Sequence, residues 1–168
     1  MRLLDSQYRS FSEIVAASTT RELNKWVSEF AQFDHASCRI LLDRLTIAAQ
    51  QRRLMPYPEF IKAVNFTLPD ANHVGMPRRV TIDASVIRSE EESIIHDFGQ
   101  YLGAATFRDC SVFINCLIVP HSRSTRPAKQ FFDWARRIKV LKNHDYKSED
   151  VFWEKAVEAV HQKYQSAA

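Results

Sequence analysis

An apolar run of ten residues, Cys110–Val119, constrains the fold more than any other part of this 168-residue chain. The run is short, rich in β-branched residues and closed by Pro120, which is typical of a buried strand rather than a helix segment. Because one strand is not stable by itself, we expect it to pair with Val80–Ile82, with Ala105–Phe107 or with a partner chain.

The remainder of the chain has the periodicity of helices. Three glycines in 168 residues are too few for the many tight turns of a β-sandwich or barrel. Apolar residues at helical spacing, most of them after a capping residue or a proline, predict helices that begin near Ser10, Thr19, Asp34, Pro58, Ser89, Pro127 and Ser148. We therefore expect an α+β fold, predominantly helical, with about seven helices around a small sheet that contains the 110–119 strand. Residues 1–168 should form a single domain.

Three of these helices carry more detailed predictions. The helices that begin at Thr19 and Asp34 should form an antiparallel hairpin that packs Trp26 against Leu41. The helix that begins at Ser89, with three glutamates in its first turn, should end near Gly103, because glycine readily adopts the left-handed conformation of a helix stop.

Positive charge is concentrated directly after the apolar run. Residues 111–147 carry eight Lys and Arg against two Asp and Glu, although the net charge of the chain is only +3. The loop His121–Arg126 combines guanidinium, hydroxyl and N–H groups ahead of a helix start, and these are the donors that bind an oxyanion. The alternative is a solvated surface turn. The predicted anion-binding residues of this loop and helix are His121, Arg123, Arg126, Lys129, Arg136, Arg137 and Lys139.

A second basic segment, residues 77–88, carries Arg78, Arg79 and Arg88. Read as a helix, it follows the predicted helix over residues 58–66 and suggests a helix-turn-helix whose arginines reach nucleic-acid bases. The gap of about ten residues is longer than the usual turn of three or four. The alternatives are two ordinary packing helices or a short strand at Val80–Ile82.

No feature of the sequence indicates catalysis, a metal site or a cofactor. Glycine-rich phosphate loops, zinc-ligand spacings and an evident acid–base pair are all missing from the sequence. The isolated histidines, His96 and His161 among them, are expected to be surface or capping residues. The three cysteines lack a C-x-x-C spacing and are expected to be reduced thiols.

The sequence therefore favours a non-enzymatic protein that binds nucleic acid, DNA rather than RNA, through the phosphate contacts of residues 121–142. One alternative is a regulatory subunit whose basic face binds an acidic partner protein. Another is a small enzyme that acts on a phosphorylated substrate. Since no stretch approaches the roughly 18 apolar residues of a membrane span and the N-terminus lacks a signal-peptide core, we expect a soluble, cytoplasmic protein.

Overall fold

The computed structural model describes residues 34–68 and 78–165. These residues form five α-helices, one 3₁₀ helix and four short strands. The helices are α3 (His35–Gln50), α4 (Tyr57–Ile61), α5 (Ser89–Cys110), the 3₁₀ helix η1 (Ile114–Leu117), α6 (Lys129–Arg137) and α7 (Tyr146–Gln165). The strands are β1 (Met55–Pro56), β2 (Asn65–Leu68), β3 (Arg78–Thr81) and β4 (Ile118–Val119).

The predominantly helical α+β fold is confirmed, but the described residues contain five α-helices rather than about seven. The predicted helices near Ser10 and Thr19, and the hairpin contact of Trp26, lie outside the described residues. None of the described helices combines the length and hydropathy that crossing a membrane requires.

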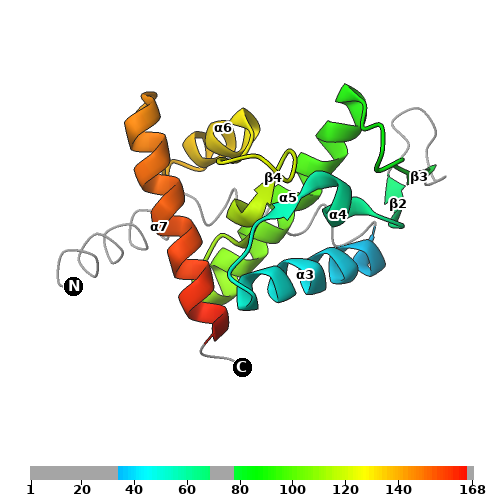
Figure 1. Ribbon diagram of the computed structural model, residues 1–168, viewed down its shortest axis with the longest axis horizontal. Helices are drawn as coiled ribbons and strands as arrows, with labels where there is room; N and C mark the ends of the chain where they lie inside the picture. Colours follow the sequence, from blue (N-terminus) through cyan, green and yellow to red (C-terminus); the bar gives the residue numbers. More distant parts are fainter. Residues whose placement is uncertain (1–33, 69–77, 166–168) are drawn as a thin grey trace.

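Helix α5 runs obliquely through the middle of the molecule (Figure 1). Helix α3 lies below it in this view, α7 stands along the left side, and α6 lies near the top beside α7. The β2–β3 hairpin projects at the right, at the opposite end from α7. The core fills the space between the helices, and Leu41, Leu45, Phe60 and Ile114 are fully buried in it.

The prediction of one strand over residues 110–119 is wrong. Helix α5 continues to Cys110 and ends at Ser111, which adopts the left-handed conformation with φ 62°. The chain then forms η1, and only Ile118–Val119 is a strand, paired in parallel with Met55–Pro56. The predicted partner strands, Val80–Ile82 and Ala105–Phe107, do not pair with it.

Side chains of neighbouring helices explain why this buried run needs no long strand. The Ile114 N–H donates to Thr106 Oγ1 of α5 (3.2 Å), and Trp153 Nε1 of α7 donates to the carbonyl oxygen of Cys116 (2.9 Å). Buried backbone groups require partners, but those partners need not belong to another strand. The run is as buried as its composition predicts, with a different backbone conformation.

The predicted helix over residues 77–88 is also wrong, and with it the helix-turn-helix. Residues Arg78–Thr81 form β3, which pairs antiparallel with β2 so that Val80 lies opposite Phe66. The first helix of the supposed motif ends at Ile61, so neither half has the required form. The short-strand alternative is the one that the structure adopts.

Helix α5 begins at Ser89 as predicted. The backbone N–H and Nε of Arg88 both donate to Glu91 Oε1, at 3.1 and 3.0 Å, and so fix the first turn. The predicted stop at Gly103 is wrong, because the helix continues past it to Cys110. Gly103 serves packing instead: a Cβ there would overlap the side-chain amide of Asn115 in η1.

Candidate functional site

The loop His121–Arg126 follows β4 and forms a tight turn on the surface. The Ser124 N–H donates to the His121 carbonyl oxygen (3.0 Å), and the His121 N–H donates to Ser124 Oγ (3.1 Å). Two of the polar groups predicted to face an anion are therefore used within the turn. The side chains of His121 and Arg123 are exposed.

Arg126, at the end of this loop, pairs with carboxylates of α7 instead of extending into solvent. Its Nη2 lies 3.1 Å from Glu149 Oε1 and 3.4 Å from Asp150 Oδ1. Its guanidinium carbon lies 4.9 Å from the centre of the Phe132 ring and 4.6 Å from that of Tyr146. Aromatic faces attract a guanidinium, so both the charge and the flat faces of this side chain already have partners.

Arg136 is fixed by the same carboxylate. Its Nη2 lies 2.6 Å from Glu149 Oε2, and its Nε and Nη2 donate to the Asn143 carbonyl oxygen at 3.0 and 2.9 Å. The side chains of Arg136 and Glu149 are only 14% and 12% exposed. Glu149 thus bridges Arg126 and Arg136, and the three side chains are here named the Glu149 bridge.

The remaining cations of the basic segment are more accessible. Lys129 reaches Asp133 at 3.4 Å, but its side chain is almost completely exposed, and an exposed pair of this kind contributes little. Arg137, Lys139 and Lys142 at the end of α6 are exposed. With Arg123, these three form no ion pair within the described residues. Arg137 does lie near Asp97: burial raises the pKa of that carboxyl, and the positive charge of Arg137 partly offsets the rise. Arg123, Arg137, Lys139 and Lys142 are here called the free cations.

The two basic segments of the sequence are not brought together. Arg78 and Arg79 lie in β3, at the end of the molecule opposite α7, whereas α6 lies beside α7 (Figure 1). They therefore do not join the loop and helix in one surface.

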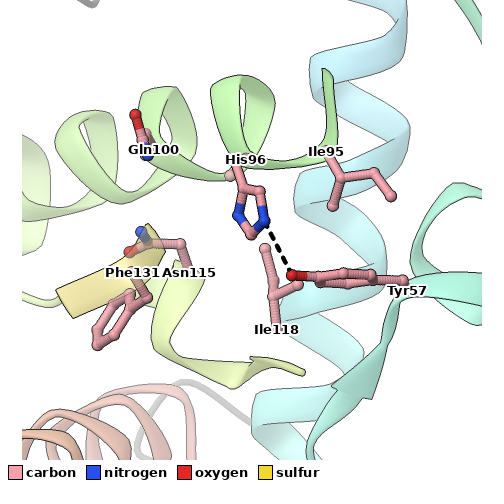
Figure 2. Close-up of a pocket in the computed structure, with 8 residues that line it drawn as sticks. Tyr57, Ile95, His96, Gln100, Asn115, Ile118 and Phe131 are labelled. Atoms are coloured by element: carbon pink, nitrogen blue, oxygen red, sulfur yellow. Dashed lines mark hydrogen bonds between the residues drawn. The ribbon is translucent and has the colours of Figure 1, made fainter. Parts of the chain in front are cut away.

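A small cavity with both polar and apolar lining residues lies between α5 and Phe131 of α6. Figure 2 shows Tyr57 of α4, His96 and Gln100 of α5, Asn115 of η1 and Phe131 of α6 around it. Tyr57 Oη and His96 Nε2 are hydrogen-bonded at 3.0 Å, and their rings meet edge to face. His96 was expected at the surface or at a cap, so this site was not predicted from the sequence. Its one sequence signal is that His96, Gly99 and Gln100 recur at helical spacing on α5.

Burial alters the titration of the cavity's ionisable groups. It lowers the pKa of His96 to about 4, and it raises the pKa of Tyr57, with a further contribution from the negative charge of Glu92. Both side chains are therefore uncharged at neutral pH. The cavity offers hydrogen-bonding groups without charge, whereas the free cations offer charge without a cavity.

Neither region has the constituents of a known catalytic or metal centre. Within residues 34–68 and 78–165, no three His, Cys, Asp or Glu side chains are grouped so as to hold a metal ion. Burial raises the pKa of Cys38 to about 12 and that of Cys116 further still, so both thiols are protonated and poorly nucleophilic. No family model matches the chain, and neither a curated protein nor a solved structure matches it.

Proposed function

We propose that the protein binds nucleic acid by contacting its phosphate backbone with the free cations that flank α6. The observation that carries this proposal is that some cations of the basic segment pair with carboxylates, whereas others are exposed to solvent. Arg126 pairs with Glu149 and Asp150, and Arg136 pairs with Glu149 and Asp133, whereas Arg123, Arg137, Lys139 and Lys142 remain exposed. The proposed contact set is accordingly smaller than the sequence predicted, and Arg78 and Arg79 are not part of it.

The dimensions of α6 agree with a backbone contact. The helix has nine residues, a length of about 14 Å, with Arg123 in the loop before it and the other three free cations at or after its C-terminal end. Duplex DNA carries one negative charge per roughly 1.7 Å of its axis, so phosphates are available at both ends of a segment this long. Contacts of this kind position a protein but carry no sequence information.

The test is a titration of the full chain with labelled DNA and RNA of the same sequence at several salt concentrations, followed by fluorescence anisotropy. Four phosphate contacts predict that log K falls with log salt with a slope of about −3.6, at roughly 0.9 per phosphate. The double variant Arg137→Gln/Lys139→Gln should weaken binding and make the slope shallower by about 1.8. DNA should bind at least as tightly as RNA.

A matched control removes the same amount of charge elsewhere. Arg39 on α3 and Lys163 near the end of α7 are exposed, and Arg39→Gln/Lys163→Gln should leave the slope unchanged. Absence of binding at low salt, or binding that salt does not weaken, contradicts the proposal. Binding to an acidic protein but to neither nucleic acid would favour the regulatory-subunit alternative instead.

A further inference from the structure

Arg78 and Arg79, the basic pair that the proposed function does not use, lie in β3 of the β2–β3 hairpin. The hairpin projects at the right of the molecule, away from α7 (Figure 1). A sheet of two strands has two outer edges, and each edge carries main-chain N–H and C=O groups that require partners. The two edges of this hairpin differ, because α3 covers one of them.

The outer edge of β2 is covered by the first turn of α3 and its capping residue. The Thr67 N–H donates to Asp34 Oδ2 (2.7 Å), and Ser37 Oγ donates to the Asn65 carbonyl oxygen (3.1 Å). The main-chain groups of Asn65 and Thr67 therefore point away from β3. Because these groups alternate in direction along an antiparallel strand, those of Phe66 point toward β3.

The outer edge of β3 follows from the register of the two strands. Val80 lies opposite Phe66, so the main-chain groups of Val80 face β2, and those of its neighbours Arg79 and Thr81 face away from it. Both neighbours are exposed. Within residues 34–68 and 78–165, neither of them forms a main-chain hydrogen bond to an element outside the hairpin. Their two N–H and two C=O groups are here called the β3 edge.

The side chains beside the β3 edge differ between the two faces of the strand. Val80 lies on the same face as the fully buried Phe66 and is itself partly exposed. Arg79 and Thr81 lie on the opposite face, and Arg79 forms no ion pair with any residue that the structure describes. A strand laid along the β3 edge would therefore place an apolar residue beside Val80 and an acidic residue beside Arg79.

We propose that the β3 edge binds an extended, acidic segment of a partner protein, antiparallel to β3, with a carboxylate opposite Arg79 and an apolar residue opposite Val80. Addition of a strand to an exposed sheet edge is a general mode of peptide recognition, in which main-chain hydrogen bonds supply affinity and alternate side chains supply specificity. This site is independent of the proposed function, because it involves none of the free cations.

Charge and hydrogen-bond chemistry distinguish this occupant from two others. A second copy of the chain would bring two further arginines of its own β3 to an edge that already carries two, and like charges across a strand pair are destabilising. A phosphate backbone would meet the charge of Arg79, but a phosphate diester has no donor for the C=O groups of the β3 edge. An acidic strand supplies both the negative charge and the donors.

The experiment is an NMR titration of the full-length, ¹⁵N-labelled protein with the acetylated and amidated heptapeptide TVTVEVT. We expect saturable shifts of the Arg79 and Thr81 amides, with a dissociation constant on the order of 0.1 to 1 mM. Amide hydrogen exchange is the second readout. In the free protein the Arg79 and Thr81 amides should exchange faster than the Val80 amide, and the peptide should slow both. Protection of Arg79 and Thr81 without peptide would overturn the proposal, as would shifts that do not saturate.

Methylation of single peptide nitrogens tests the main-chain pairing without altering the protein. In the antiparallel register the N–H of the peptide's glutamate faces β3, whereas the N–H of the valine before it faces solvent. Methylation of the glutamate nitrogen should weaken binding by about tenfold or more, and methylation of the valine nitrogen is the matched control and should weaken it much less. Equal loss with both peptides would overturn the proposal.

Charge reversal tests the acidic character of the partner. Replacement of the peptide's glutamate by lysine should weaken binding to the wild type by about fivefold. Arg79→Glu should reverse this preference, and Arg39→Glu, at an exposed position of α3, should retain it. An Arg79→Glu variant that still prefers the glutamate peptide would overturn the proposal. Because the methylated peptides need no substitution, the proposal remains testable if Arg79→Glu fails to fold.

The other two occupants give different results in the same experiment. Shifts of the Arg79 and Thr81 amides that depend on protein concentration would assign the β3 edge to a second copy. Shifts of these amides with DNA but not with the peptide would assign it to phosphates, and either result would overturn the proposal. Failure of the peptide to bind leaves the salt-dependent binding of DNA by the free cations untouched. Loss of DNA binding in the Arg137→Gln/Lys139→Gln variant, in turn, does not affect the peptide titration.

Discussion

Gly103 shows how one residue can be misjudged from sequence and then explained by its contact. In the middle of a helix, glycine is about 1 kcal/mol less favourable than alanine, so its presence there calls for a reason. That reason is the Asn115 amide, which occupies the place of the missing Cβ. Asn115 is almost completely buried, so it has no free space into which to move.

We predict that Gly103→Ala lowers the free energy of unfolding by about 1 to 2 kcal/mol, because the strain of overpacking outweighs the gain in helix propensity. Chemical denaturation of the purified variant measures this change. The milder case is Gly99→Ala, where the new Cβ would lie 3.0 Å from Ile118 Cδ1, and it should cost less.

The double variant Gly103→Ala/Asn115→Ala identifies the cause. Shortening Asn115 removes the overlap, so the added methyl group at position 103 should be tolerated or even stabilising in that background. If Gly103→Ala lowers the free energy of unfolding equally in the wild type and in the Asn115→Ala variant, the contact with Asn115 is not the cause of the loss.

Among the elements, α6 and α7 are joined by the Glu149 bridge, whose three members lie between positions 126 and 149. Partly buried hydrogen bonds to a charged group contribute roughly 1.5 to 3 kcal/mol each. We predict that Glu149→Gln lowers the free energy of unfolding by about 2 kcal/mol, because the nearly buried Arg136 then keeps only its longer, 3.5 Å contact with the carboxylate of Asp133. Thermal and urea denaturation measure the loss.

The same substitution has a second consequence if the free cations bind nucleic acid. Removing the negative charge of Glu149 makes the surface beside α6 more positive, although Arg126 keeps Asp150 and Arg136 keeps Asp133. Glu149→Gln should therefore bind DNA more tightly at low salt and show a steeper salt dependence. Glu158→Gln, which removes an exposed carboxylate near the other end of α7, is the control and should change neither property much. Weaker DNA binding by a folded Glu149→Gln variant would count against this surface.

Helix ends in the described part of the chain depend on non-glycine residues in the left-handed conformation. These residues are Arg52, Ala63, Ser111 and Lys139, with φ of 52°, 58°, 62° and 64°. Such a conformation costs an ordinary residue roughly 1 kcal/mol or more. We predict that Ala63→Gly raises the free energy of unfolding by about 1 kcal/mol. Ala36→Gly, at an exposed position in the first turn of α3, should lower it, by less than the full penalty of glycine in a helix interior. The denaturation midpoints of the two variants are compared with that of the wild type. A lower midpoint for Ala63→Gly would contradict the expectation.

These ends also explain what sequence reasoning could and could not predict. Amphipathic spacing predicted α3, α6 and α7, because burial of one helix face leaves a direct record in the sequence. Glycine was a poor guide to where helices stop: α5 passes through Gly103 and stops at Ser111. In residues 110–119, apolar composition predicted burial, but it does not report whether a strand or a 3₁₀ helix is buried.

Contacts between distant residues were the least predictable part of the candidate site. Local charge counts indicated a basic segment, but Arg126 and Glu149 are 23 residues apart, and no local pattern predicts that they pair. Tyr57 and His96 are 39 residues apart, and each is unremarkable in its own segment. The tertiary fold alone determines which cations are neutralised and which polar groups share a cavity.

At the scale of the whole molecule, the cavity around His96 exists only when five elements are assembled, so its titration reports on global folding. The folded protein holds the pKa of His96 at about 4 through burial, whereas an unfolded chain has an ordinary histidine pKa near 6.5. Between these two values the unfolded state binds more protons than the folded state. The free energy of unfolding must therefore fall as the pH is lowered from about 6.5 to about 4.

We predict that this one group accounts for a loss of about 3 kcal/mol over that interval, at 1.36 kcal/mol per pKa unit. His96→Gln removes the titrating group, so urea denaturation of this variant should show a flatter pH dependence than the wild type between pH 6.5 and 4. Burial of His161 also lowers its pKa, but that contribution is common to both proteins and cancels in the comparison.

Tyr57→Phe removes the hydroxyl while leaving the ring in place. Because burial rather than the hydrogen bond lowers the pKa, most of the wild-type slope should persist in Tyr57→Phe, and its disappearance would assign the effect to the hydroxyl instead.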